Sequence, residues 1–180
     1  MHQVVTSEIK FKGRVFTAMV EDIVTPSGQQ VTREVARHKG GTSILPIKIN
    51  PEGVHHVILV KQYRHAISNY LLEIPAGILE PNEAPLVGAV RELQEETGYI
   101  AHNPRKLLHM HKTAGYCDEI HHLHVCEVSG KPGPTNFDPE EDIEVVELPL
   151  EAVVSMIFTG QIVDAKTIAS VLAYREQARG

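Results

Sequence analysis

The segment GILEPNEAPLVGAVRELQEETGY, residues 77–99, constrains what the chain folds into more than any other stretch. Its apolar residues recur at the spacing of a helix, which places them on one side. Pro85 is tolerated only in the first turn of a helix, so the helix begins close to Glu83, and Gly98 is well placed to end it. We therefore predict one helix here, in a chain whose other segments mostly favour strands.

Three acidic residues, Glu92, Glu95 and Glu96, follow Arg91 on this helix. At about 100° per residue they cluster away from the apolar side. Like charges one turn apart destabilise a helix, and carboxylates near its C-terminal end oppose the helix dipole. Either a bound partner offsets this cost or water screens it, so a functional site and a solvated acidic face are both open interpretations.

The remaining elements predict two regions that meet at the Gly40-Gly41 pair. We expect a small N-terminal β-sheet in residues 1–40 and a larger domain in residues 41–180. The predicted strands are 4–11, 14–24, 31–38, 43–49, 54–63, 105–111, 120–128 and 142–148, and residues 70–77 are predicted to be a short strand that ends in a loop. The predicted closing helices are 149–160 and 164–178.

The net charge of −6 argues against a dedicated nucleic-acid binder, which normally carries a basic stripe. It does not exclude a phosphate-bearing small molecule, because a bound divalent cation reverses the local charge. We see no apolar run fit for a signal peptide and no segment with the length of a membrane helix. The two cysteines, Cys117 and Cys126, are expected to be reduced thiols. We expect a cytoplasmic protein that binds neither nucleic acid nor membrane.

The spacing around the acidic helix resembles the signature of the Nudix hydrolases, a glycine, five residues, a glutamate, seven residues and then Arg-Glu-Leu-x-Glu-Glu-x-Gly. The fixed positions are present at Gly77, Glu83, Arg91, Glu92, Leu93, Glu95, Glu96 and Gly98. Tyr99 stands where the family usually has an aliphatic residue. The resemblance implies an α/β fold, a Nudix-type α/β/α sandwich with a mixed sheet, here with a small N-terminal antiparallel β-sheet added.

In this family the glutamates hold divalent cations against a pyrophosphate, and Mg²⁺ is the expected cofactor, with Mn²⁺ as an alternative. Magnesium is a hard ion that takes oxygen ligands. The resemblance implies that Glu92 and Glu96 are metal ligands, that Glu95 is close to the metal or bridges to it through water, and that the carbonyl of Ala76 is a further ligand.

The other fixed positions are expected to support these ligands. The resemblance assigns Gly77, Glu83 and Gly98 to the support of the site. Arg91 is expected to orient the carboxylates as an ion pair, and it joins Glu95 in the catalytic group.

Segments outside the signature resemble the branch that hydrolyses ADP-ribose and ADP-sugars, in which the extra N-terminal sheet builds a homodimer. Arg64 and Glu73 match positions that contact phosphate, ribose or the nucleotide, and Arg37 and Gly115 complete the expected substrate-binding set. The alternatives are a surface arginine at Arg64 and a turn glycine at Gly115. The branch normally has proline where this chain has Ala114, which leaves room for other nucleoside diphosphate sugars.

A general base is expected from the late acidic segment NFDPEEDIEVVEL. Glu140 and Glu141 are the candidates, one as the base and the other as an additional metal ligand, and an acidic loop in solvent is the alternative. The resemblance thus predicts Mg²⁺-dependent hydrolysis of ADP-ribose or a related nucleotide sugar to a nucleoside monophosphate and a sugar phosphate. Hydrolysis of another nucleotide sugar, such as GDP-mannose, and a non-catalytic Nudix-fold ligand sensor are the alternatives.

The eleven histidines include a group at His121, His122 and His124, which raises the question of a zinc site. No CxxC or HExxH pattern accompanies them. We expect these imidazoles to be exposed or hydrogen-bonded instead.

Overall fold

The structure is a computed structural model, and it describes residues 1–136 and 142–178. The chain forms two compact units. The first consists of Met1–Gly40 together with His111–Ile120, and the second of Gly41–Met110 together with His121–Gly180. A segment from the middle of the chain therefore joins the N-terminal unit, which a single boundary at residue 40 did not anticipate.

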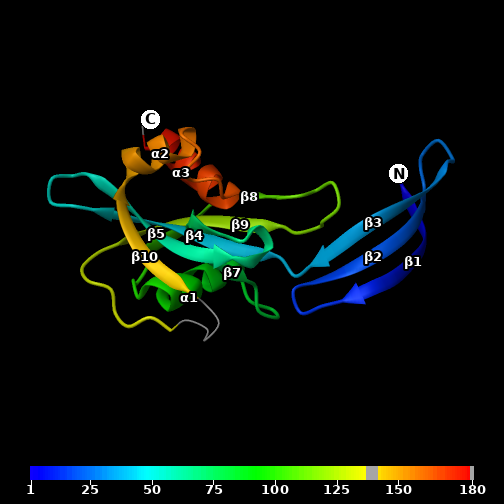
Figure 1. Cartoon of the computed structure of the whole chain (residues 1–180), viewed down its shortest axis with the longest axis horizontal. Coiled ribbons are helices and arrows are strands. Elements are labelled where there is room, and N and C mark those ends of the chain that lie inside the picture. The colour runs from blue at the N-terminus through cyan, green and yellow to red at the C-terminus, as the bar shows by residue number, and fades with distance from the viewer. Residues whose placement is uncertain (137–141, 179–180) are drawn as a thin grey trace. The chain divides into compact units, whose positions relative to one another are not determined.

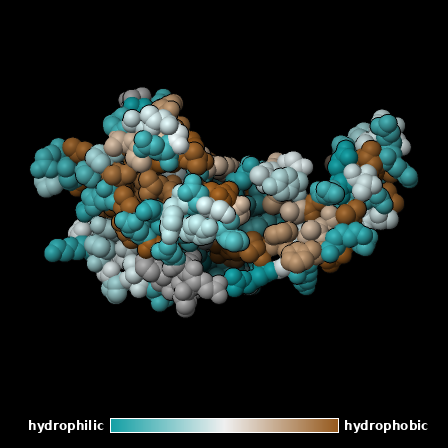
Figure 2. All heavy atoms as spheres, in the orientation of Figure 1, coloured by the Kyte–Doolittle hydropathy of each residue, from teal (hydrophilic) through white to brown (hydrophobic). Residues whose placement is uncertain are grey.

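The first unit is an antiparallel sheet of three strands in the order β1-β2-β3 (Figure 1). The strands are β1 (Gln3–Lys12), β2 (Phe16–Val24) and β3 (Gln30–His38). Hydrophobic side chains of this sheet are exposed at the surface (Figure 2). A single small sheet without a second layer packed on it cannot bury its own faces. Val4, Ile9 and Phe11 of β1 are all exposed.

The segment His111–Ile120 is bound to β3 through its backbone. The Ala36 amide donates to the Tyr116 carbonyl at 2.7 Å, and the Asp118 amide donates to the Ala36 carbonyl at 3.2 Å. The Asp118 side chain accepts a further bond from the His38 amide at 2.8 Å. These bonds satisfy backbone groups on the edge of the small sheet, which would otherwise be unpaired.

The second unit is built on a seven-stranded mixed sheet with the central order β10-β5-β4-β9-β8. Strand β4 pairs parallel with β9, and the other pairs are antiparallel. The strands are β4 (Gly41–Ile49), β5 (His55–Arg64), β6 (Asn69–Glu73), β7 (Ala76–Ile78), β8 (His102–Met110), β9 (His121–Val128) and β10 (Ile143–Pro149). A 3₁₀ turn, η1 (His65–Ile67), connects β5 to β6.

Helices cover both faces of this sheet (Figure 1). Helix α1 (Pro85–Thr97) packs on one face, and α2 (Leu150–Phe158) and α3 (Ala165–Gln177) pack on the other. Successive strand residues separate accordingly, since side chains alternate across a strand: Ile58 of β5 belongs to the cluster under α1, and its neighbour Leu59 to the cluster under α2 and α3. The predicted α/β/α sandwich with a mixed sheet and an added N-terminal antiparallel sheet is confirmed.

Residues 70–77 were expected to be a short strand that ends in a loop, and the end of this segment forms a second strand, β7. Pro75 lies between β6 and β7, and because it has no amide proton it cannot donate to a neighbouring strand, so the strand is interrupted there. Strand β6 pairs with β5, whereas β7 pairs with β4. The Pro75 carbonyl accepts from the Ile44 amide at 3.1 Å, so the break is itself attached to β4. The chain thereby changes its pairing partner immediately before Ala76 and Gly77.

Candidate active site

The bounds of α1 follow from two residues. Pro85 occupies the first helical position after Ala84, and Gly98 ends the helix in the left-handed conformation, with φ of 70°. The Gly98 carbonyl then accepts from the Gly133 amide at 2.8 Å, and the Asn136 amide donates to the Glu95 carbonyl at 2.9 Å. The segment before the late acidic stretch is therefore bound to the C-terminal end of α1. The predicted start near Glu83 and the predicted end at Gly98 are both confirmed.

Arg91 joins three carboxylates of the signature. Its Nε and Nη2 donate to the two oxygens of Glu83 at 2.9 and 3.1 Å. Its Nη1 donates to Glu92 Oε1 at 2.8 Å and to Glu95 Oε2 at 2.9 Å. The hydrogen bond to Glu83 is the main reason that the pKa of Arg91 is raised, and Arg91 in turn lowers the pKa of Glu83. One guanidinium thus offsets the like-charge repulsion along the helix.

Glu96 lies one turn after Glu92 on α1 and is buried. It is only 4% exposed, so the solvated acidic face that the sequence left open does not apply to Glu96. The position is three residues after Leu93, which puts both on the same face of the helix. The amide of Ala76 donates to Glu96 Oε2 at 3.2 Å, and this contact helps to compensate for the burial of the carboxylate.

Gly77 leaves room for the Glu92 carboxylate. A Cβ atom on Gly77 would lie 1.8 Å from Glu92 Oε1 and 2.1 Å from Glu92 Cδ, so any larger residue would displace that carboxylate. Strand β7 and helix α1 therefore present three groups side by side, which are the Ala76-Gly77 backbone, Glu92 and Glu96. A cleft of about 350 Å³ opens next to this arrangement, and its lining residues are Arg91, Gln94, Glu95, Pro134 and Asn136.

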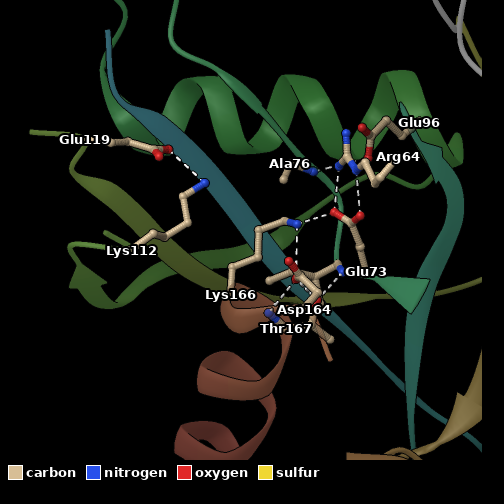
Figure 3. Close-up of polar contacts among 10 residues, drawn as sticks. Arg64, Glu73, Ala76, Glu96, Lys112, Glu119, Asp164, Lys166 and Thr167 are labelled. Carbon is tan, nitrogen blue, oxygen red and sulfur yellow. Dashed lines mark hydrogen bonds and ion pairs between the residues drawn. The ribbon is translucent and has the colours of Figure 1, made fainter. Parts of the chain in front are cut away.

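Arg64 is the last residue of β5 and Glu73 the last residue of β6, and their side chains form a bidentate ion pair (Figure 3). The register pairs Glu73 with Val60, so the Arg64 side chain reaches back along the antiparallel pair to meet it. Arg64 Nε donates to Glu73 Oε1 and Nη2 donates to Oε2, each at 2.6 Å. Glu73 is 1% exposed, whereas the Arg64 side chain is 39% exposed. Burial alone would raise the pKa of Glu73, but the bonds from Arg64 and the charge of Lys166 hold it at about 2. The hydrogen bonds to Glu73 are the main cause of the raised pKa of Arg64, and the negative charge of the nearby Glu96 carboxylate is a smaller one.

The N-terminal turn of α3 packs against this ion pair through Lys166, Asp164 and Thr167. The sequence analysis did not predict that these residues lie at the site. Lys166 Nζ donates to Glu73 Oε2 and lies 3.1 Å from Asp164 Oδ2. Asp164 caps α3 by accepting from the Thr167 amide at 3.0 Å. The Asp-x-x-Thr pattern predicts the cap, but nothing local predicts that Lys166 contacts a strand residue 93 positions earlier.

Two predicted substrate-binding residues, Arg37 and Gly115, lie in the first unit. Arg37 Nη2 donates to Glu21 at 2.7 Å and Nη1 to Asp118 at 3.3 Å, and these two bonds raise the pKa of Arg37. Gly115 sits in the turn that Thr113 closes through its carbonyl, and a Cβ there would meet nothing within 4 Å. The predicted catalytic residues Glu140 and Glu141 lie outside the described residues.

The histidines of β9 differ in their surroundings. His124 is buried, and its Nδ1 lies 3.1 Å from the Ser43 carbonyl and 3.3 Å from Thr42 Oγ1. The His122 ring lies 6.4 Å from that of His109. Burial is the largest cause of the lowered pKa of both His122 and His124. These contacts tie β9 to the neighbouring strands.

Three comparisons with known proteins agree on the family. The NUDIX domain matches residues 41–171. The chain is 36% identical to the methanol dehydrogenase activator of Bacillus methanolicus and 35% identical to an ADP-ribose pyrophosphatase of Bacillus subtilis, in each case over 93% of this chain and 89% of the relative. It is 33% identical to a GDP-mannose pyrophosphatase of Shigella flexneri, over 82% of this chain and 80% of the relative.

The fold is also that of a solved structure described as an ADP compounds hydrolase. The TM-score is 0.84, with 22% identity, over 99% of this chain and 95% of that one. The chain therefore belongs to the Nudix hydrolase family. Within the described residues, no helix is both long and apolar enough to cross a membrane.

Nudix proteins generally use a divalent metal ion, and the donors near α1 fit one. Glu92, Glu95 and Glu96 supply carboxylate oxygens beside the Ala76-Gly77 backbone, and such oxygens are the ligands that hard cations prefer. In residues 1–136 and 142–178, no three His, Cys, Asp or Glu side chains are grouped as a metal site. Arg91 bonds to Glu92 and Glu95, and the Ala76 amide bonds to Glu96.

Proposed function

We propose that this protein hydrolyses the diphosphate bond of ADP-ribose or a related nucleoside diphosphate sugar with the help of Mg²⁺. The products are a nucleoside monophosphate and a sugar phosphate. The observation that carries the proposal is the convergence of Glu92 and Glu96 on the Ala76-Gly77 backbone, with the cation Arg64 close to Glu96. The names of the relatives from Bacillus subtilis and Shigella flexneri support a nucleotide diphosphate as the substrate class.

The residues of the chain have separable roles in this proposal. Glu92 and Glu96, with the Ala76 carbonyl, would hold the metal ion, and Glu95 would assist them. A bound Mg²⁺ would supply neutralisation of the diphosphate charge and activation of a water molecule. Arg91 and Glu83 keep the carboxylates oriented through the ion pairs described above. Gly77 and Gly98 give the backbone the close approach and the turn that this orientation requires.

Arg64 is the residue that would bind the substrate phosphate, because a guanidinium matches phosphate oxygens with paired N–H donors. Glu73 would orient the Arg64 guanidinium and would not bind the substrate itself, because both of its oxygens already accept hydrogen bonds from Arg64. Glu140 or Glu141 would act as the general base, with the other as a metal ligand. Arg37 and Gly115 are proposed as further contacts to the nucleotide.

The test is product analysis with a panel of substrates and Mg²⁺. The panel contains ADP-ribose, GDP-mannose, UDP-glucose and diadenosine polyphosphates, and chromatography separates the products. We expect AMP and ribose 5-phosphate from ADP-ribose, with loss of turnover in Glu96→Gln and unchanged turnover in the matched control Glu151→Gln on α2. Turnover of no panel member by folded wild-type protein would refute the proposal and favour the ligand sensor. GDP-mannose is the second candidate substrate, on the likeness to the Shigella protein.

We also propose that residues 1–40 form a dimerisation region. The support is the set of exposed apolar side chains on β1, which a second copy of the chain would bury. Sedimentation equilibrium on the wild type and on Ile9→Glu tests this. A dimeric wild type and a monomeric variant are expected, whereas a monomeric wild type would contradict the proposal.

A further inference from the structure

Lys166 is an unusual residue because its charged side chain is buried. It is 5% exposed, although a buried ammonium group is costly unless it is paired. It comes from the first turn of α3, and none of the roles described above uses it. Its contacts are Glu73 Oε2 and, at 3.1 Å, Asp164 Oδ2.

The carboxylate of Glu73 is held between two cations from different elements. Arg64 on β5 binds both oxygens, and Lys166 on α3 binds Oε2 from another direction (Figure 3). A carboxylate with only Arg64 as its partner could rotate together with the guanidinium. With Lys166 in place, the orientation of Glu73 is fixed, and so is the plane of the Arg64 fork.

The backbone next to Glu73 is fixed by the same turn of α3. The Ile74 amide donates to Thr167 Oγ1 at 2.9 Å, and Thr167 Oγ1 donates to Asp164 Oδ2 at 2.6 Å. Thr167 is fully buried. Two connections therefore run from α3 to the end of β6, one through the side chain of Glu73 and one through the backbone of Ile74.

The two bonds to Glu73 leave the Nη1 group of Arg64 without a protein partner among the described contacts. A guanidinium has five N–H donors, so Arg64 can keep Glu73 and still bind a phosphate oxygen. The Arg64 side chain as a whole is 39% exposed, so it can be reached from solvent. What Arg64 lacks by itself is a fixed direction, because a long side chain at the surface loses conformational entropy when it binds.

We propose that Lys166 is a positioning residue for substrate binding. It holds Glu73, and through Glu73 it holds Arg64 in the orientation that receives the phosphate of the substrate. Lys166 itself touches neither the substrate nor the metal. The identity of the ligand rests on the proposed function, whereas the ordering of Arg64 by Lys166 does not.

The first test needs no substrate. NMR measures the exchange of the Arg64 Nε proton with water in the wild type, with the exposed Arg14 as the internal reference. We expect Arg64 to exchange at least about tenfold more slowly than Arg14, and Lys166→Met to remove most of that difference. Equal exchange of Arg64 and Arg14 in the wild type would overturn the proposal, also if Lys166→Met failed to fold.

The second test is a double-mutant cycle with the nucleotide sugar that the wild type turns over best. Lys166→Met is expected to raise KM about tenfold with little change in kcat, and to change KM less than about twofold when Arg64→Ala is already present. The same factor in both backgrounds would mean that Lys166 acts only on the fold, which would overturn the proposal. Arg175→Met is the matched control on α3, since it removes the outer ion pair with Glu151. It should leave KM unchanged.

The two tests also separate the two proposals. Absence of turnover in the wild type would refute the proposed function, and the proton exchange of Arg64 would still decide on Lys166.

Discussion

Replacing Gly98 by alanine is expected to destabilise the protein, whereas the same change at Gly133 is not. The two glycines face each other where the segment after β9 meets the end of α1. A Cβ on Gly98 would lie 2.2 Å from the Gly133 oxygen and 2.9 Å from its carbonyl carbon, and Gly98 has φ of +70°. A Cβ on Gly133 would lie 3.5 Å from the Gly98 oxygen, an ordinary contact, and Gly133 is not in the left-handed region.

The expected magnitude follows from these contacts. An alanine in the left-handed region costs about 1–2 kcal/mol. The segment must also move away from the new methyl group, and this breaks the 2.8 Å bond from the Gly133 amide to the Gly98 carbonyl, which contributes roughly 1 kcal/mol. Gly98→Ala should therefore lose about 2–3 kcal/mol, or roughly 5–10 °C in Tm for a chain of this size. Gly133→Ala should stay within about 0.5 kcal/mol of the wild type.

Urea titration and scanning calorimetry measure both variants against the wild type. We expect a lower urea midpoint and a lower Tm for Gly98→Ala, and wild-type values for Gly133→Ala. Equal losses for the two variants would mean that any side chain in this contact is harmful, and an unchanged Gly98→Ala would mean that the segment adapts without cost. Either result would refute the reasoning.

Two further predictions concern the site. Gly77→Ala should abolish most turnover while changing Tm little, because the new Cβ would displace the flexible end of the Glu92 side chain and no backbone. Activity assays and calorimetry on the same preparation test this prediction. Full activity of the variant would contradict it. The pKa of Glu73 is lowered from 4.5 to about 2, so its ionised form contributes stability that is complete above pH 4.5 and is lost as the pH falls towards 2. The difference in unfolding free energy between wild type and Glu73→Gln should thus be about 3 kcal/mol near pH 7 and shrink below pH 4.5. A difference that does not change between pH 3 and pH 7 would refute the lowered pKa of Glu73.

The sequence predicted most of the secondary structure because its signals are local. Pro85 and Gly98 define the ends of α1 through the geometry of a proline ring and a left-handed residue, and both effects act within one turn. The signature likewise indicated which acids share a helix. It also led us to expect an ion pair at Arg91, which the structure contains in three branches.

The contacts that the sequence did not reveal are long-range. Lys166 meets Glu73 because α3 packs on the sheet at one particular register, and no periodicity specifies that register. The joining of His111–Ile120 to β3 combines backbone bonds, which carry no residue signal, with bonds of the Asp118 side chain to residues about 80 positions earlier. The sequence also left a solvated position open for Glu96, because the donor that meets its buried carboxylate, the Ala76 amide, lies 20 residues earlier in the chain.

The measurement that tests the central claim most directly is metal binding at the acidic end of α1. Electron paramagnetic resonance of Mn²⁺ titrated into the protein reports bound ion without any substrate. The account predicts saturable binding in the wild type and in Glu151→Gln, and loss of this binding in the double variant Glu92→Gln/Glu96→Gln with its fold intact. Equal binding by the double variant and the wild type would contradict the claim that these carboxylates hold the cation.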